Sequence, residues 1–112
     1  MNDLPVILQV HKFYAKTAKA TEKLPSPKKQ TLGRRTEDAV LGLLEYLVMA
    51  KNAPKHLKAP YLIKATALAE VLMFHLRTFV EEKLANETLL HQMQAELLEI
   101  QRQIGGWLKS AK

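Results

Sequence analysis

The chain has no cysteine, only four glycines and five prolines, and an aromatic fraction of 6%. The missing cysteine excludes a disulfide framework, a thiolate metal site and a cysteine nucleophile. The scarcity of aromatic side chains disfavours recognition of single-stranded nucleic acid by base stacking. The longest apolar run, residues 39–50, contains Glu45 and is about twelve residues long, whereas a membrane helix needs about twenty. We therefore expect no membrane partner.

Signals for export and catalysis are also missing. The opening segment, residues 1–7, has no cationic flank before an apolar stretch, so we expect no signal peptide and a cytoplasmic location. The sequence has no Gly-rich phosphate loop, Gly-x-Ser-x-Gly or zinc-protease motif. It also has no Glu-x-x-His pair of the kind that bundle metal sites use. Glu87 and His91 fit a surface helical pair, and His75 fits a partly buried histidine of no special role. We predict no enzyme, cofactor or metal.

The amino-acid composition of the chain is typical of globular proteins. It has 112 residues, a mass of 12.7 kDa, 47% apolar residues and 25% charged residues. This is enough for one domain with a real core, and it argues against wholesale disorder. We predict a single domain over residues 1–112.

Apolar residues recur at helical spacing in four long segments, and no segment alternates as a strand would. Pro25 and Pro27 separate the first two segments, Pro54 separates the next two, and Asn86 is placed to cap the last. The pattern predicts helices near 5–23, 31–52, 56–83 and 87–108. Four helices with short connections predict an all-α fold, an antiparallel up-down four-helix bundle.

Two features exceed the needs of a monomeric bundle. Several apolar side chains lie off the main helical stripes, which indicates either a wide core or a subunit interface. They are Val48, Met49, Leu62, Met73, Leu89 and Leu98. In addition, Gly105 and Gly106 stand within the last segment, where Trp107 and Leu108 continue its apolar spacing. We therefore expect the helix to continue through the glycines.

The net charge of +6 is concentrated in the first half of the chain. Residues 1–64 have a net charge of +7 and residues 65–112 a net charge of −1. On the first helix four lysines fall within an arc of roughly 60°, opposite the apolar face, and further cations follow in the loop and the second helix. Such a ladder suits a phosphate backbone. The candidate nucleic-acid-binding residues are Lys12, Lys16, Lys19, Lys23, Lys28, Lys29, Arg34 and Arg35.

The alternative is that these lysines only solvate the outer face of an amphipathic helix. One-sidedness argues against it, because Glu22 is the only acidic residue between Lys12 and Arg35. The charge pattern indicates phosphate but no base sequence, and it does not separate RNA from DNA. Arg35 has a structural alternative of its own, pairing with an acidic neighbour.

Three motifs carry a family resemblance. Residues 25–35, Pro-Ser-Pro-Lys-Lys-Gln-Thr-Leu-Gly-Arg-Arg, resemble an interhelical loop signature that ends in Thr-Leu-Gly-x-Arg. Residues 104–109, Ile-Gly-Gly-Trp-Leu-Lys, resemble a closing Gly-Gly-Trp motif, and residues 4–7, Leu-Pro-Val-Ile, resemble a common opening. Together they resemble the Avd (accessory variability determinant) proteins of diversity-generating retroelements, over nearly the whole chain. The loop of this chain is richer in proline than the family pattern.

The resemblance implies a homopentameric barrel of four-helix protomers with a basic surface. It implies binding of RNA or DNA without sequence specificity and of the retroelement's reverse transcriptase, in support of mutagenic cDNA synthesis and retrohoming. It implies no catalytic residues. The family's nucleic-acid contacts are scattered basic residues, so the candidate residues above rest on the charge pattern.

Two other readings remain open. The wider four-helix group includes proteins encoded in 23S rRNA intervening sequences, which would make this a structural, ribosome- or RNA-associated protein. A toxin-type or metal-binding bundle enzyme is the third, and the missing ligand pairs count against it. A neighbouring reverse-transcriptase gene with template and variable repeats would distinguish the first two.

Overall fold

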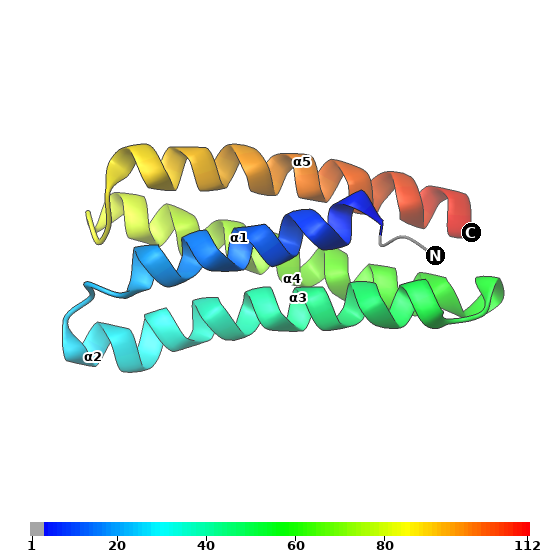
Figure 1. The fold of residues 1–112 in the computed structure, drawn as a ribbon, viewed down its shortest axis with the longest axis horizontal. Helices are drawn as coiled ribbons and strands as arrows, with labels where there is room; N and C mark the ends of the chain where they lie inside the picture. Colours follow the sequence, from blue (N-terminus) through cyan, green and yellow to red (C-terminus); the bar gives the residue numbers. More distant parts are fainter. Residues whose placement is uncertain (1–3) are drawn as a thin grey trace.

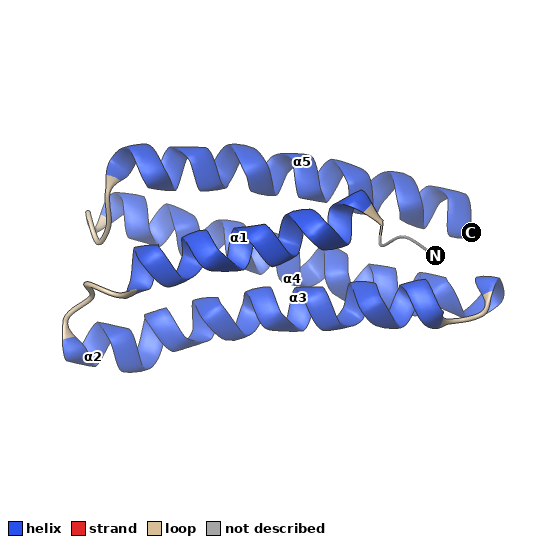
Figure 2. Cartoon of the chain, in the orientation of Figure 1, coloured by secondary structure: helices blue, strands red, loops and turns tan. Residues whose placement is uncertain are grey.

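The computed structural model describes residues 4–112, so Met1 to Asp3, which open the segment assessed for a signal peptide, lie outside it. The described chain is helical, with short connections and no strand (Figures 1 and 2). Its long helices are α1 (Pro5–Thr21), α3 (Arg34–Asn52), α4 (Lys58–Glu81) and α5 (Glu87–Ala111). Three short elements complete it: the α-helical turn α2 (Ser26–Lys28), the π-helical turn η1 (Lys29–Gly33) and the 3-10 turn η2 (Lys55–Leu57). The prediction of an all-helical fold is confirmed.

The long helices form an elongated bundle of 44 × 23 × 23 Å. α1 packs against α3 and α5, and α4 packs against α3 and α5, so the four helices enclose one core (Figure 1). Each helix contributes fully buried side chains at helical spacing, as the periodicity predicts. The largest are Phe13, Phe79, Leu43, Leu47, Leu62, Leu72, Leu76, Leu90, Met93, Leu97, Ile100 and Ile104.

The two prolines of the first connection differ in outcome: Pro25 is extended, as the sequence predicts, whereas Pro27 is helical. Pro25 is extended and precedes a helix that already begins at Ser26, five residues before the predicted start at 31. Pro27 lies in the first turn of that helix, where the missing N–H has no helical partner to lose. Helical backbone then continues through η1 into α3 and ends at Asn52. The prediction of a non-helical connection before residue 31 was therefore wrong for residues 26–30.

The turn between α4 and α5 is closed by backbone hydrogen bonds. Lys83 has a φ of 53°, the left-handed conformation usually left to glycine. Leu84 N donates to the Phe79 carbonyl at 2.9 Å and Lys83 N to the Val80 carbonyl at 3.2 Å, which together form a Schellman motif. Asn86 Oδ1 then accepts a hydrogen bond of 2.9 Å from Leu89 N. The predicted Asn86 cap is confirmed.

Helix α5 passes through Gly105 and Gly106 without a break and ends at Ala111 rather than at 108. A Cβ added at either glycine would meet nothing within 4 Å. The expected continuation is confirmed, but no close packing within the protomer accounts for the glycines.

The off-stripe apolar residues divide into two groups. Leu62 is completely buried, and Met73 and Leu89 are half-buried against the core, so these three widen the core. Val48, Met49 and Leu98 are exposed. The structure adds further exposed apolar side chains that the sequence analysis did not single out: Leu8, Leu41, Leu57, Ile63, Val71 and Phe74.

Helix α4 is apolar on more than its core side, with Ile63, Val71 and Phe74 exposed at 55%, 46% and 62%. The stretch Lys55–Glu81 is long and apolar enough to cross a membrane by length and composition, a property that core helices of soluble bundles share. Among residues 4–112, this stretch and not residues 39–50 meets that criterion.

Candidate nucleic-acid interface

The four lysines of the predicted stripe follow α1 and the turn after it. Lys12 and Lys19 are exposed on α1, and Lys23 is exposed two residues beyond the end of the helix. The opposite side of α1 buries Val6, Val10, Phe13 and Ala20 in the core. The apolar face thereby fixes the direction in which the lysines point, which is away from the bundle.

Lys16 differs from its neighbours on the stripe. It is half-buried, and its ammonium forms an ion pair with Glu96 of α5, across the α1–α5 contact. Because both side chains keep about a third of their surface exposed, water screens the pair and its contribution to stability is small. The carboxylate nevertheless offsets the charge of Lys16, so this lysine attracts phosphate less than Lys12, Lys19 and Lys23 do.

The two lysines of the first connection are also engaged. Lys28 Nζ lies 2.6 Å from Glu82 Oε1, which links the first connection to the end of α4. Lys29 Nζ donates to the Glu22 carbonyl at 3.2 Å, a contact that leaves its charge uncompensated. Of the six lysines, Lys16 and Lys28 therefore form ion pairs with carboxylates, and Lys28 and Lys29 lie in helical turns and not in a loop.

Arg34 and Arg35 lie on a different surface. They line a groove of about 650 Å³ between α3 and α4, together with Gln30, Thr31, Asp38, Ala39, Leu68, Val71 and His75. Both arginines are exposed, and no carboxylate within residues 4–112 forms an ion pair with either. The alternative in which Arg35 pairs with an acidic neighbour is not what the structure shows.

His75, which sequence reasoning gave no special role, is partly buried as predicted and lines this groove. Its Nδ1 lies 3.0 Å from Thr36 Oγ1, across the α3–α4 contact. Burial lowers the pKa of the His75 imidazole, and the nearby positive charge of Arg35 lowers it further. No sequence signal could place it here, because Thr36 and His75 are 39 positions apart.

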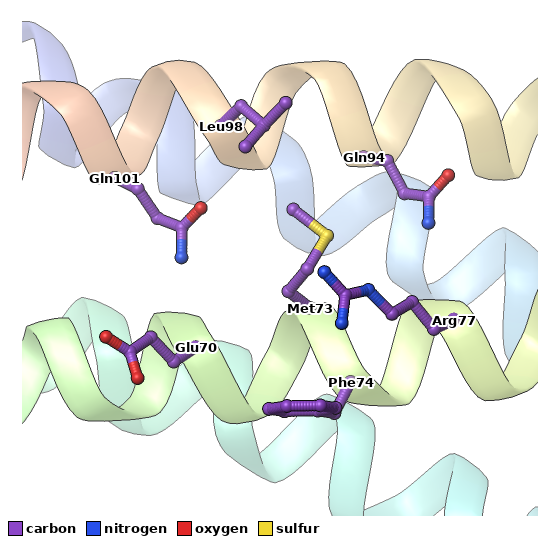
Figure 3. A pocket seen from close by; sticks show the side chains of 7 residues that line it. All are labelled: Glu70, Met73, Phe74, Arg77, Gln94, Leu98 and Gln101. Atoms are coloured by element: carbon purple, nitrogen blue, oxygen red, sulfur yellow. The ribbon is translucent and has the colours of Figure 1, made fainter.

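A second groove, of about 400 Å³, lies between α4 and α5 (Figure 3). Met73 and Arg77 extend from α4 toward Leu98, Gln94 and Gln101 of α5. The Arg77 guanidinium carbon lies 5.2 Å from the centre of the Phe74 ring, within the range of a cation–π contact. With Phe74 62% and Leu98 61% exposed, this groove is bordered by the two most exposed large apolar side chains of the described chain.

Residues 4–112 contain no group of three or more His, Asp and Glu side chains placed to hold a metal ion. His91 Nε2 lies 4.0 Å from Glu87 Oε1 on the same helix, so this pair is the surface contact that its spacing predicts.

Comparison with protein-family models, curated proteins and solved structures finds no match to this chain. The resemblance to Avd proteins therefore rests on the three sequence motifs, and the functional assignment rests on those motifs and on the charged surfaces described above.

Proposed function

We propose that this protein is a non-catalytic accessory protein of a diversity-generating retroelement, which acts in the cytoplasm. In this role it binds the template RNA or its cDNA, and the retroelement's reverse transcriptase, and so supports mutagenic cDNA synthesis and retrohoming. The observation that carries the proposal is the one-sided set of exposed cations, above all Lys12 and Lys19 on a helix whose other face is buried, and Lys23 in the turn that follows it.

The mechanism is electrostatic. Each exposed ammonium or guanidinium that meets a phosphate releases a condensed counterion, so affinity comes from entropy and falls as salt rises. The phosphates position the nucleic acid but give no sequence information, which agrees with a protein that accepts the template, the cDNA and their duplex. The reverse transcriptase supplies the chemistry, and the accessory protein holds the nucleic acid near it.

We further propose that the four helices follow an up-down order and that five protomers form a ring. The order is supported by the packing of α1 on α3, α3 on α4 and α4 on α5, with short connections between them. The ring is supported by exposed apolar side chains on three helices, a surface that a second copy would cover. They are Leu41, Val48, Met49, Ile63, Phe74 and Leu98.

A ring would repeat the basic face of each protomer around its outside. Several weak patches on one particle bind a long polymer far more tightly than one patch does, because each contact raises the effective concentration for the next. Light scattering should give about five times 12.7 kDa. A monomer at micromolar concentration would contradict the ring.

The central test is replacement of Lys12, Lys19 and Lys23 by glutamine, which leaves the Lys16–Glu96 ion pair in place. Because three ammonium groups no longer meet phosphates, the slope of log affinity against log salt for single-stranded RNA should fall by about 2. A matched control replaces Lys55, Lys64 and Lys109, three exposed lysines elsewhere on the bundle, with the same loss of charge. Helicity and particle mass should not change in either variant.

If the stripe variant binds RNA as the parent does, the lysines of α1 are only a solvated face. The contacts would then lie among Lys51, Lys55, Lys58, Lys64 and Arg77. Co-purification with the cognate reverse transcriptase and its RNA tests the partner directly. Association with ribosomes but not with the reverse transcriptase would favour the intervening-sequence type of four-helix protein.

A further inference from the structure

The groove between α3 and α4 is lined by polar and charged side chains from two helices and from the π-helical turn. Arg34 and Arg35 open α3 next to the π-helical turn that supplies Gln30 and Thr31, and His75 faces them from α4. A π turn inserts one extra residue into a helix and so changes which side chains share a face; such turns are frequent at functional sites. Here the helix with this turn presents both arginines to one groove.

The hydrogen bonds of Thr36 fix the tautomer of His75. The Thr36 hydroxyl donates its single proton to the Leu32 carbonyl, with Oγ1 and the carbonyl oxygen 2.7 Å apart. Oγ1 can therefore only accept from His75, at 3.0 Å, so the Nδ1 of the neutral imidazole holds the proton. The other nitrogen, Nε2, is then a lone-pair acceptor in the neutral ring and becomes a donor when the ring is protonated.

The charges around His75 disfavour that protonation in the free protein. The charged groups that line the groove are Arg34, Arg35 and Asp38, all on α3. The π turn contributes the neutral Gln30 and Thr31, and no side chain of α1 or α5 within the described chain lines the groove. The formal charges of these three groups sum to one positive charge beside the neutral ring. A singly charged oxyanion would balance this charge and so remove the net electrostatic opposition to protonation of the ring.

We propose that Arg34, Arg35 and His75 form a phosphate subsite, and that its affinity for a phosphate group rises when His75 is protonated. The inference rests on the proposed function and deepens it, because it assigns one backbone phosphate of the bound nucleic acid to a defined place. Each guanidinium group has a planar fork of N–H donors that matches the spacing of phosphate oxygens, and protonated Nε2 adds a further donor. Binding and protonation then favour each other by linkage.

The first experiment uses sulfate, an oxyanion whose charge does not change between pH 5.5 and 8. Imidazole resonances of the isotopically labelled protein, followed during titration with sulfate, should show His75 in its Nδ1–H form and its pKa rising as sulfate binds. His91, an exposed histidine on α5, should not respond and serves as the internal control. Equal responses at His75 and His91 would overturn the proposal, because they would indicate general screening.

The second experiment replaces sulfate with an oligothymidylate that has hydroxyl groups at both ends, so that every phosphate is internal and singly charged. Its affinity should rise about three- to tenfold between pH 7.5 and pH 5.5, the range expected from a shift of up to one pKa unit in a single linked group. A response to sulfate with no pH-dependent response to the oligonucleotide would refute assignment to the nucleic-acid backbone and leave a free-anion site.

Two variants make the assignment specific. His75→Asn keeps an amide that can donate to Thr36 Oγ1 but lacks Nε2, and it should abolish the pH dependence while affinity at pH 7.5 changes less than twofold. Arg35→Gln should weaken sulfate binding at every pH, whereas Arg102→Gln, the loss of an exposed arginine on α5, should not. If His75→Asn retains the pH dependence, the proposal is wrong.

The outcome is separable from that of the proposed function. The lysine variants of α1 test whether the protein binds nucleic acid through the first helix, and the sulfate titration needs neither nucleic acid nor reverse transcriptase. Particle mass is measured for each variant. If Arg35→Gln changes the mass of the assembly and leaves the sulfate affinity unchanged, the groove receives a neighbouring copy and the phosphate subsite is refuted.

Discussion

Replacing Gly105 and Gly106 with alanine should stabilise the protein. Both glycines lie within α5, and glycine costs about 0.8–1 kcal/mol more than alanine at an interior helical position. The new methyl groups have room, because a Cβ at either position would meet no atom within 4 Å. Since the glycines are within two turns of the end at Ala111, where helices fray, we expect about 1–2 kcal/mol for the pair.

This gain converts to a shift in melting temperature. Unfolding entropies near about 2.1 cal/mol/K per residue make 1–2 kcal/mol worth about 4–8 °C for a chain of 112 residues. Circular dichroism at 222 nm would follow the melting of the parent and the double variant. Both must be at the same protein concentration, because an assembly melts at a temperature that depends on concentration.

Gly42 provides the matched control. It lies on α3 where that helix approaches α4, and a Cβ there would meet Leu68 Cδ1 at 3.1 Å. Crowding then opposes the gain in helix propensity. Gly42→Ala should therefore raise the melting temperature by less than half of the rise produced by the double replacement of Gly105 and Gly106. If the double variant melts below the parent, the reasoning from the protomer is refuted. A simultaneous fall in particle mass would show that another chain packs against the glycines.

Three further predictions follow from local geometry. Lys83→Gly should raise the free energy of unfolding, measured with urea, by about 0.5–1 kcal/mol, because glycine adopts the φ of 53° without the steric cost of a Cβ. An unchanged urea midpoint would contradict the Schellman assignment. Asn86→Ala should cost about 1 kcal/mol by removing the acceptor for Leu89 N, whereas Asn86→Asp should retain most of the stability. Burial and Arg35 lower the pKa of His75 in the folded protein, so acidification from pH 7.5 to 5.5 should lower the free energy of unfolding. His75→Asn should reduce this loss of stability, and an identical pH dependence in the variant would contradict the lowered pKa.

Sequence reasoning predicted the helices well because each buries a periodic face, and that signal is local. It misplaced the start of the second helical segment because it treated Pro27 as a breaker. Pro60 is the third residue of α4, and the tolerance of a first turn for proline applies to Pro27 in the same way. The π turn over residues 29–33 had no sequence signal, because its identity depends on one inserted residue and on how the flanking helices pack.

The candidate site was predictable only where it follows one helix. Lys12 and Lys19 share a face of α1 because of helical geometry alone, and Lys23 follows in the turn after the helix. The partner of Lys16 is 80 positions away and that of Lys28 is 54 positions away, so both ion pairs depend on how helices meet. The groove that joins Arg35 to His75 depends on the α3–α4 contact in the same way. Sequence reasoning therefore found the cations and missed what neutralises or assists them.

The placement of the chain ends has a practical consequence for attaching the protein to a surface. The start of α1 and the end of α5 lie at one end of the bundle, and the α1–α2 and α4–α5 connections lie at the other (Figure 1). The distal end holds Lys23 and Lys28, and the Lys28–Glu82 ion pair joins its two connections. A protein tethered through either terminus would therefore present these two connections, with the exposed Lys23, away from the surface, where a nucleic acid in solution can reach them.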